Sequence, residues 1–220
     1  MFEQIRVKGN ININNKMEVN NIVFNDSKTP KQGIFKHVFV NNNDTNSDVM
    51  KNVSFEIEKV KTPFGVSYSE FNNDIKATIS LSLDKNQNHI IDFINDFETL
   101  LLKTAEDRSD HWFGKELNVS ELKTMLKRSL YHKNKDFPPS LTLKVNPNVI
   151  VCDENRNVIK LSSIKKGQYV NVKFEIGGIW ISNNKFGITW KVIQIESLKY
   201  KPKAKPKGDV LSQYAFNDEE

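Results

Sequence analysis

Three aromatic residues and three lysines between positions 165 and 198 have the side chains that a single-stranded nucleic acid surface needs. The aromatic residues are Trp180, Phe186 and Trp190, and the lysines are Lys173, Lys185 and Lys191. Aromatic rings can stack on bases of any sequence, and ammonium groups can follow the phosphates. The alternative role is structural, in which the rings pack inside the fold and the lysines only solvate its rim. The two roles place the rings on opposite faces of a strand.

Side-chain alternation separates the two tryptophans. Trp180 lies between Ile179 and Ile181, so in a strand it faces away from both. Isoleucine is the residue type that is more often buried. Trp190 shares its parity with Ile188, which is typical of a core position. We therefore expect Trp180 to be the better stacking residue of the two.

The stretch around these residues predicts a three-stranded antiparallel meander. Its three runs of strand-like sequence are 170–176, 179–182 and 188–195. The pair Gly177-Gly178 is predicted to end the first strand. The pair Asn183-Asn184 is predicted to form the turn after the second strand.

Two helices are predicted before the meander. Apolar residues recur at three- and four-residue spacing over residues 88–109, and the outer face of this helix, Glu98 included, is acidic. Asn118 and Glu121 have the spacing of a capping box, which starts a second helix with a basic outer face. We assign the helical insert to residues 88–135. A polyanion must avoid the acidic face, so its path should lie beside the second helix and the meander.

Eight further residues are candidates for nucleic-acid binding. They lie on the second helix and its exit, on one strand face, and at a hairpin tip predicted over residues 62–65: Lys123, Lys127, Arg128, Tyr131, Lys133, Lys144, Phe64 and Lys61. A run of lysines is also typical of a face that is only solvated, and a ring in a turn can simply cover it.

Alternating apolar residues predict strands on both sides of the helical insert. The predicted strands are 34–40, 53–60, 76–83, 141–145, 149–151 and 158–161, the last two as a hairpin. Residues 1–15 predict an N-terminal strand extension, and residues 20–32 a loop. Strand–helix alternation is absent, which excludes a parallel α/β sheet. We predict a mainly β fold with a helical insert (α+β), an OB-fold-like antiparallel barrel with two helices between strands, over residues 1–198.

The character of the chain changes after residue 198. Lysines alternate with proline and alanine over residues 199–207, which predicts an extended linker. Residues 208–220 predict an acidic, aromatic-bearing, disordered tail. Its candidate partner-binding residues are Tyr214, Phe216, Asp218, Glu219 and Glu220. Such a tail can occupy a basic groove as a decoy, or it can be a solvated terminus without a role.

The composition points to a soluble, intracellular protein with a polyanionic partner. Its 32 Lys and Arg exceed its 27 Asp and Glu, for a net charge of +5. No apolar run is long enough to cross a bilayer, and no secretory leader is recognisable, so we expect no membrane partner. A single cysteine, Cys152, excludes an internal disulfide.

Sequence motifs for catalysis, metal binding or cofactor binding are missing. There is no phosphate loop, no paired-cysteine pattern and no histidine pair at helical spacing. We therefore expect no enzyme, no metal and no cofactor. Residues 107–111 (Asp-Arg-Ser-Asp-His) are the one candidate corner for a metal-dependent nuclease, and a solvated helix end is the preferred interpretation.

Several stretches together resemble a known family. KKGQYVNVKFEIGGIW, NNKFGITWKVIQI, the preceding PPSLTLKV and the acidic terminus are similar to the single-stranded DNA-binding proteins of large nucleocytoplasmic DNA viruses. Those proteins are in turn similar to the replication single-strand binder of short-tailed coliphages. The resemblance covers residues 53–198. It implies an OB-fold barrel, sequence-tolerant single-strand binding, a host cytoplasmic (viral factory) or nuclear location, and a tail that contacts viral DNA polymerase or other replication proteins.

The leading hypothesis is therefore a non-enzymatic protein that binds single-stranded DNA in viral replication, recombination or repair. The second hypothesis is a protein-interaction module or minor virion component that does not bind nucleic acid. A homodimer is compatible with both.

Overall fold

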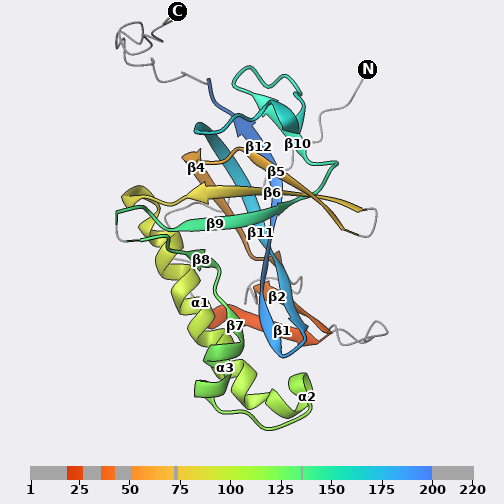
Figure 1. The fold of residues 1–220 in the computed structure, drawn as a ribbon. Coiled ribbons are helices and arrows are strands. Elements are labelled where there is room, and N and C mark those ends of the chain that lie inside the picture. Colours follow the sequence, from red (N-terminus) through yellow and green to blue (C-terminus); the bar gives the residue numbers. More distant parts are fainter. Residues whose placement is uncertain (1–18, 27–35, 43–50, 72–73, 135, 200–220) are drawn as a thin grey trace, which may run out of the picture.

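The computed structural model describes residues 19–26, 36–42, 51–71, 74–134 and 136–199 (Figure 1). The strands are β1 (Ile22–Asp26), β2 (Lys36–Asn42), β3 (Lys51–Asn52), β4 (Ser54–Thr62), β5 (Val66–Phe71), β6 (Asp74–Ser82), β7 (Leu126–Lys127), β8 (Leu130–Tyr131), β9 (Ser140–Val145), β10 (Ile150–Asp153), β11 (Gln168–Ser182) and β12 (Lys185–Ser197). The helices are α1 (Asn88–Asp107), α2 (Ser109–Phe113) and α3 (Val119–Met125). The fold is thus mostly β with a helical insert, as predicted.

Strand β11 is the strand around which the sheet is arranged. It pairs antiparallel with β12, with β4 and, near its end, with β2. From β4 the pairings run to β6, β9, β12, β11 and back to β4. Two of these steps rest on single residue pairs, Lys61 with Ser82 and Lys191 with Lys144. Strand β12 pairs in parallel with β7, β9 and β10, so the prediction of a wholly antiparallel sheet is wrong.

The predicted three-stranded meander is a hairpin of two long strands. Strand β11 runs for 15 residues and continues through Gly177-Gly178, where the register shifts by a bulge instead of ending. Gly178 has a φ of +115°, which only glycine adopts readily. The predicted turn at Asn183-Asn184 is confirmed, because both residues have positive φ (49° and 57°) and connect β11 to β12.

Several strands were missed by the predictions. Strands β7 and β8 lie within the helical insert predicted over residues 88–135, because α3 already ends at Met125. Strand β1 lies inside the predicted loop 20–32 and pairs antiparallel with β2. Strand β5 follows the turn at Phe64 and pairs with β6. The predicted hairpin of 149–151 with 158–161 is reduced to one bridge between Cys152 and Val158. The strand predicted over residues 1–15 lies outside the described residues.

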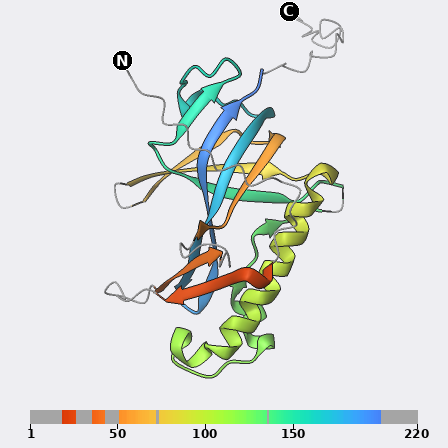
Figure 2. The same cartoon turned by 180° about the vertical axis from the view of Figure 1, so that it is seen from behind.

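The helical insert packs against β1 and against the turn end of the β11–β12 hairpin (Figures 1 and 2). The rings of Phe24 on β1 and Phe97 on α1 stack with centroids 5.9 Å apart. The predicted capping box is confirmed, since Asn118 and Glu121 exchange side chain–backbone hydrogen bonds at the start of α3. The insert contains three helices, not two, because α2 follows α1 directly.

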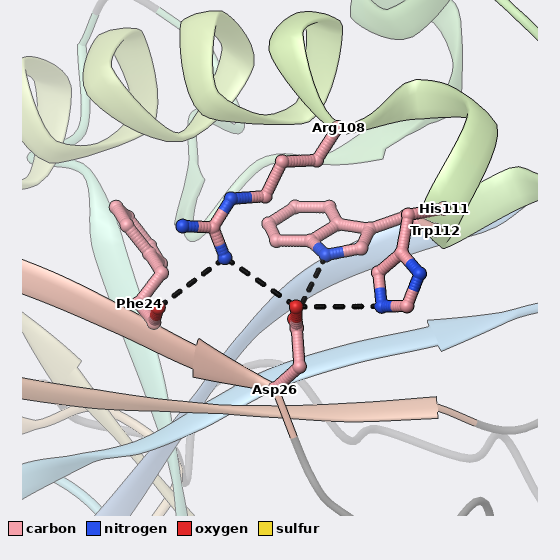
Figure 3. Close-up of polar contacts among 5 residues, drawn as sticks. All are labelled: Phe24, Asp26, Arg108, His111 and Trp112. Atoms are coloured by element: carbon pink, nitrogen blue, oxygen red, sulfur yellow. Dashed lines mark hydrogen bonds and ion pairs between the residues drawn. The ribbon is translucent and has the colours of Figure 1, made fainter.

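Asp26 at the end of β1 ties this strand to the helices (Figure 3). Its carboxylate accepts hydrogen bonds from Trp112 Nε1 at 3.0 Å and Arg108 at 3.4 Å, and it lies 3.4 Å from His111 Nε2. Arg108 also donates to the carbonyl of Phe24. Arg108 and His111, two residues of the candidate nuclease corner at 107–111, therefore hold β1 against the helices.

The described residues contain no group of three or more His, Cys, Asp or Glu side chains placed to hold a metal ion. Within the same part of the chain, every helix is too short or too polar to cross a membrane.

Candidate nucleic-acid interface

Trp180 lies half-buried on the outward face of the β11–β12 hairpin. It pairs in register with Gly187 on β12. A Cβ at Gly187 would lie 3.0 Å from Cζ2 of the indole and 3.1 Å from the carbonyl oxygen of Lys127. The ring therefore lies directly against the glycine, and the side chain remains partly exposed. The outward orientation agrees with the parity argument made from Ile179 and Ile181, both of which are buried.

Two lysines lie beside this ring at the end of the hairpin. Lys127 on β7 pairs with Gly187 and has an exposed side chain. Lys185 at the start of β12 is exposed, and its Nζ donates to the carbonyl of Thr124 at 2.8 Å. That bond attaches the lysine to the last turn of α3. The sequence predicted both lysines as candidates, and the structure brings them to the strands around Trp180.

A second group of lysines lies where β6, β9 and β12 meet. Lys144 pairs with Lys191, and the stem of Lys191 lies over Gly177, so that a Cβ there would be 2.5 Å from its Cε. The pKa of Lys144 is lowered, first because burial disfavours its charge and then because Lys76 and Lys191 place positive charge nearby. Like charges held together in this way favour an anion between them.

The outward faces of β6 and β9 form a strip of small hydroxyl side chains between these lysines and two tyrosines. The hydroxyl strip consists of Thr78, Ser80, Ser82, Ser140 and Thr142. At one end Thr78 pairs with Lys144. At the other end, five residues on neighbouring strands are successive register partners across four strand pairs. In order they are Tyr169, Lys61, Ser82, Ser140 and Tyr131. Tyr131 is 66% exposed, so its ring is available on this face.

Phe186 and Trp190 are core residues, and the prediction that they lie on the binding surface is wrong. Phe186 is 0% exposed and its ring meets that of Phe113 edge-on at 5.4 Å. Trp190 is 3% exposed and packs against Phe174. Both have the inward parity of β12, and for Trp190 this confirms the core position that its shared parity with Ile188 indicated.

Arg128 has a structural partner that the sequence did not predict. Its guanidinium pairs with the carboxylate of Glu98, which is 2% exposed although it was expected on the outer face of the helix. Glu98 also accepts a hydrogen bond from the backbone of Ser129. Arg128 Nη2 donates to Asn95. The charge of Arg128 is therefore already neutralised within the fold.

The remaining predicted residues do not join one site. Lys173 is exposed on β11 opposite Glu56, Lys123 is exposed on α3, and Lys133 lies 5.1 Å from the Phe137 ring centroid. Phe64 is 63% exposed in the turn before β5. The predicted tail residues lie outside the described part of the chain.

Three residues of this surface were not predicted as site residues. They are His37, Phe39 and Lys76. Alternation in the predicted strand 76–83 already turned Lys76 outward, whereas no facing was predicted for His37 and Phe39. The signal that could have found them is their alternation with Val38 and Val40, which are buried. Local sequence pattern could not predict that β2 pairs with β11. The two strands are far apart in sequence, since His37 and Gly177, which are in contact, are 140 positions apart.

The mostly β fold with its helical insert is similar to that of a solved phage single-stranded DNA-binding protein. The chain itself belongs to a family of unknown function (DUF5871), which matches residues 72–218. No curated protein matches its sequence.

Among solved structures, the chain resembles gp2.5, a single-stranded DNA-binding protein encoded by bacteriophage T7. The two are 11% identical, the match covers 76% of this chain and 97% of that chain, and the TM-score is 0.51. At this identity the likeness concerns the fold alone. The single-stranded DNA-binding protein from bacteriophage Enc34 also matches. Its complex with ssDNA is 12% identical with a TM-score of 0.45 (84% and 98% covered), and its C-terminal truncation is 15% identical with a TM-score of 0.47 (81% and 96% covered).

Proposed function

We propose that this protein binds single-stranded DNA with little sequence preference and without catalysis. The observation that carries the proposal is the partly exposed indole of Trp180, which lies against Gly187 on the outward side of the hairpin, with Lys127 and Lys185 on the adjoining strands. A ring held in this way can stack on any base, and the ammonium groups can neutralise the adjoining phosphates. The similar T7 protein is a single-stranded DNA-binding protein by name.

The strand order supports an OB-type barrel as the framework of this surface. The cyclic pairing β4–β6–β9–β12–β11 has antiparallel steps and one parallel step, between β9 and β12. Taken as the five strands of an OB fold, its second and third strands are β6 and β9. That face binds oligonucleotides in OB folds. It carries the hydroxyl strip and ends at Lys144.

The chemistry of this face suits a nucleic acid backbone. Small hydroxyl side chains leave room for the sugar-phosphate chain and can hydrogen-bond to it. Lys76, Lys144 and Lys191 supply positive charge at one end. The single-stranded DNA would run from these lysines toward Trp180. The stem of Lys191 lies over Gly177 on β11, and the next outward ring along β11 is the indole of Trp180.

The biological setting follows from the sequence resemblance. We propose a role in viral DNA replication, recombination or repair, with residues 208–220 recruiting viral DNA polymerase or other replication proteins. The lysine-rich segment 199–207 would separate this tail from the folded part. Assembly as a homodimer is compatible with this role.

Fluorescence anisotropy with labelled oligo-dT and with a duplex of equal length tests the proposal. We expect tight binding of oligo-dT that weakens with salt at a logarithmic slope of about −0.7 per phosphate contacted. Binding of the duplex should be much weaker, because its bases are not free to stack. Absent or salt-independent binding of oligo-dT would contradict the proposal and favour a protein-interaction module.

A further inference from the structure

Strand β2 carries two more rings on the same face as Trp180. His37 is the register partner of Trp180, so the two side chains project to the same side of the sheet. Phe39 follows on that side, and its ring centroid lies 4.9 Å from that of His37 at an interplanar angle of 72°. Phe39 is 51% exposed, whereas Val38 and Val40 on either side are buried at 2% and 3%.

The imidazole of His37 is held in place by the backbone beneath it. Its Nε2 lies 3.0 Å from the carbonyl oxygen of Gly177. A Cβ at Gly178 would lie 2.5 Å from the ring, so the imidazole occupies the space that any other residue would fill. Phe39 meets this fixed ring edge-on. The imidazole and the Phe39 ring therefore keep a defined arrangement on the strand next to Trp180 before any ligand binds, which lowers the entropic cost of binding.

We propose that Phe39 and His37 form a second base-stacking subsite, which extends the single-strand path from Trp180 onto β2. The inference rests on the proposed function. Its ligand is a nucleobase of the same strand, chosen because the rings continue directly from Trp180 and because Lys127 and Lys185 provide charge for the adjoining phosphates. The exposed ring of Phe39 contributes little to the core, whose contacts on β2 are made by Val38 and Val40.

The test is the affinity of the Phe39→Ala full-length protein for oligo-dT of increasing length. Short oligomers that occupy only the Trp180 part should bind the variant and the wild type equally. Longer oligomers should lose about fivefold or more in affinity, the loss expected for one stacked base. Ile150→Ala is the matched control, because Ile150 is 60% exposed on β10 at the other end of β12 and should bind every length like the wild type.

Two more variants separate stacking from folding. Phe39→Tyr keeps an aromatic face and should retain long-oligomer affinity, whereas Phe39→Leu keeps only apolar bulk and should lose it. Thermal unfolding of all variants should match the wild type. If Phe39→Ala binds oligomers of every length as tightly as the wild type does, the inference is overturned, and the exposed ring would instead contact a protein. Failure of the wild type to bind oligo-dT is a different result, which would overturn the proposed function instead.

Discussion

At the scale of single residues, glycines determine where the binding side chains lie. Gly187 supports the Trp180 indole, and Gly177 supports the stem of Lys191. Neither glycine has a positive φ, so alanine is compatible with the backbone at both positions. Substitution there tests the position of the side chain above and not the conformational freedom of the glycine.

Gly187→Ala should displace the Trp180 ring and weaken single-strand binding several-fold, because the new Cβ would lie 3.0 Å from the indole. A double-mutant cycle with Trp180→Ala measures the coupling. In the Trp180→Ala background the glycine substitution should have a much smaller effect on affinity, limited to its contact with the Lys127 carbonyl oxygen. Additive losses from the two substitutions would show that Gly187 acts independently of the indole.

The charge of Lys144 should lower the stability of the folded protein and raise its affinity for single-stranded DNA. Its pKa is lowered by burial and by Lys76 and Lys191, so its proton is bound less tightly in the folded than in the unfolded protein. Below the lowered pKa the charge therefore costs stability, and that cost disappears as pH rises through the folded and then the unfolded pKa. Lys144→Met should raise the melting temperature at neutral pH while reducing affinity for oligo-dT.

The pH profile provides the control for Lys144. A bound phosphate favours the charged lysine, so wild-type affinity should fall on the alkaline side at a pH below the usual lysine range. Lys144→Met should lack this early fall, and its salt dependence should be shallower by about 0.7 in logarithmic slope if one phosphate contact is lost. An identical pH profile in both proteins would contradict the assignment.

At the scale of elements, two neighbouring cations at the exit of α3 have different roles. Arg128 pairs with the buried Glu98, whereas Lys127 is exposed beside Gly187. Arg128→Ala should lower the free energy of unfolding by about 3 kcal/mol, because it leaves a buried carboxylate without its counter-charge. Lys127→Ala should leave stability within about 0.5 kcal/mol of the wild type and weaken oligo-dT binding. Chemical denaturation and anisotropy on both variants measure the contrast, and a reversed pattern would refute it.

Local pattern was sufficient for the elements whose burial follows alternation. Ile79 and Leu81 face inward as their period of two predicted, and the capping box of Asn118 begins a helix. Local pattern failed where a segment distant in sequence determines whether a residue is buried or how far a strand extends. Glu98 is buried because the chain after α3 folds back onto α1, and the bulge at Gly177 allows one long strand where a break was predicted.

The same limit applies to the binding surface. The isoleucines on either side of Trp180 correctly predicted that it faces outward. The extension of this surface to His37 could not be predicted, because it depends on the pairing of β2 with β11. Phe186 was included because it is aromatic and flanked by a lysine, but residue type does not report parity. The outward lysines Lys144 and Lys191 meet only because β9 and β12 pair.

At the scale of the whole molecule, charge is divided between the folded part and its last residues. The sequence ends in an acidic segment after Lys207, whereas the outward face carries lysines from several strands. If the acidic segment competes for that face, truncation after Lys207 should raise affinity for single strands, most strongly at low salt, where electrostatic competition is least screened. Titration of full-length and truncated protein at two salt concentrations measures the effect, and equal affinities would reject competition.

The central claim is that single-stranded DNA stacks on Trp180, and intrinsic fluorescence tests it most directly. Trp112 and Trp190 are 2% and 3% exposed, so of the three tryptophans only Trp180 can meet a base without opening the core. Titration with oligo-dT should quench the emission of the wild-type protein, and Trp180→Phe should abolish most of the quenching while retaining binding by anisotropy. Absence of quenching in the wild type at saturating oligo-dT, or equal quenching in Trp180→Phe, would contradict the account.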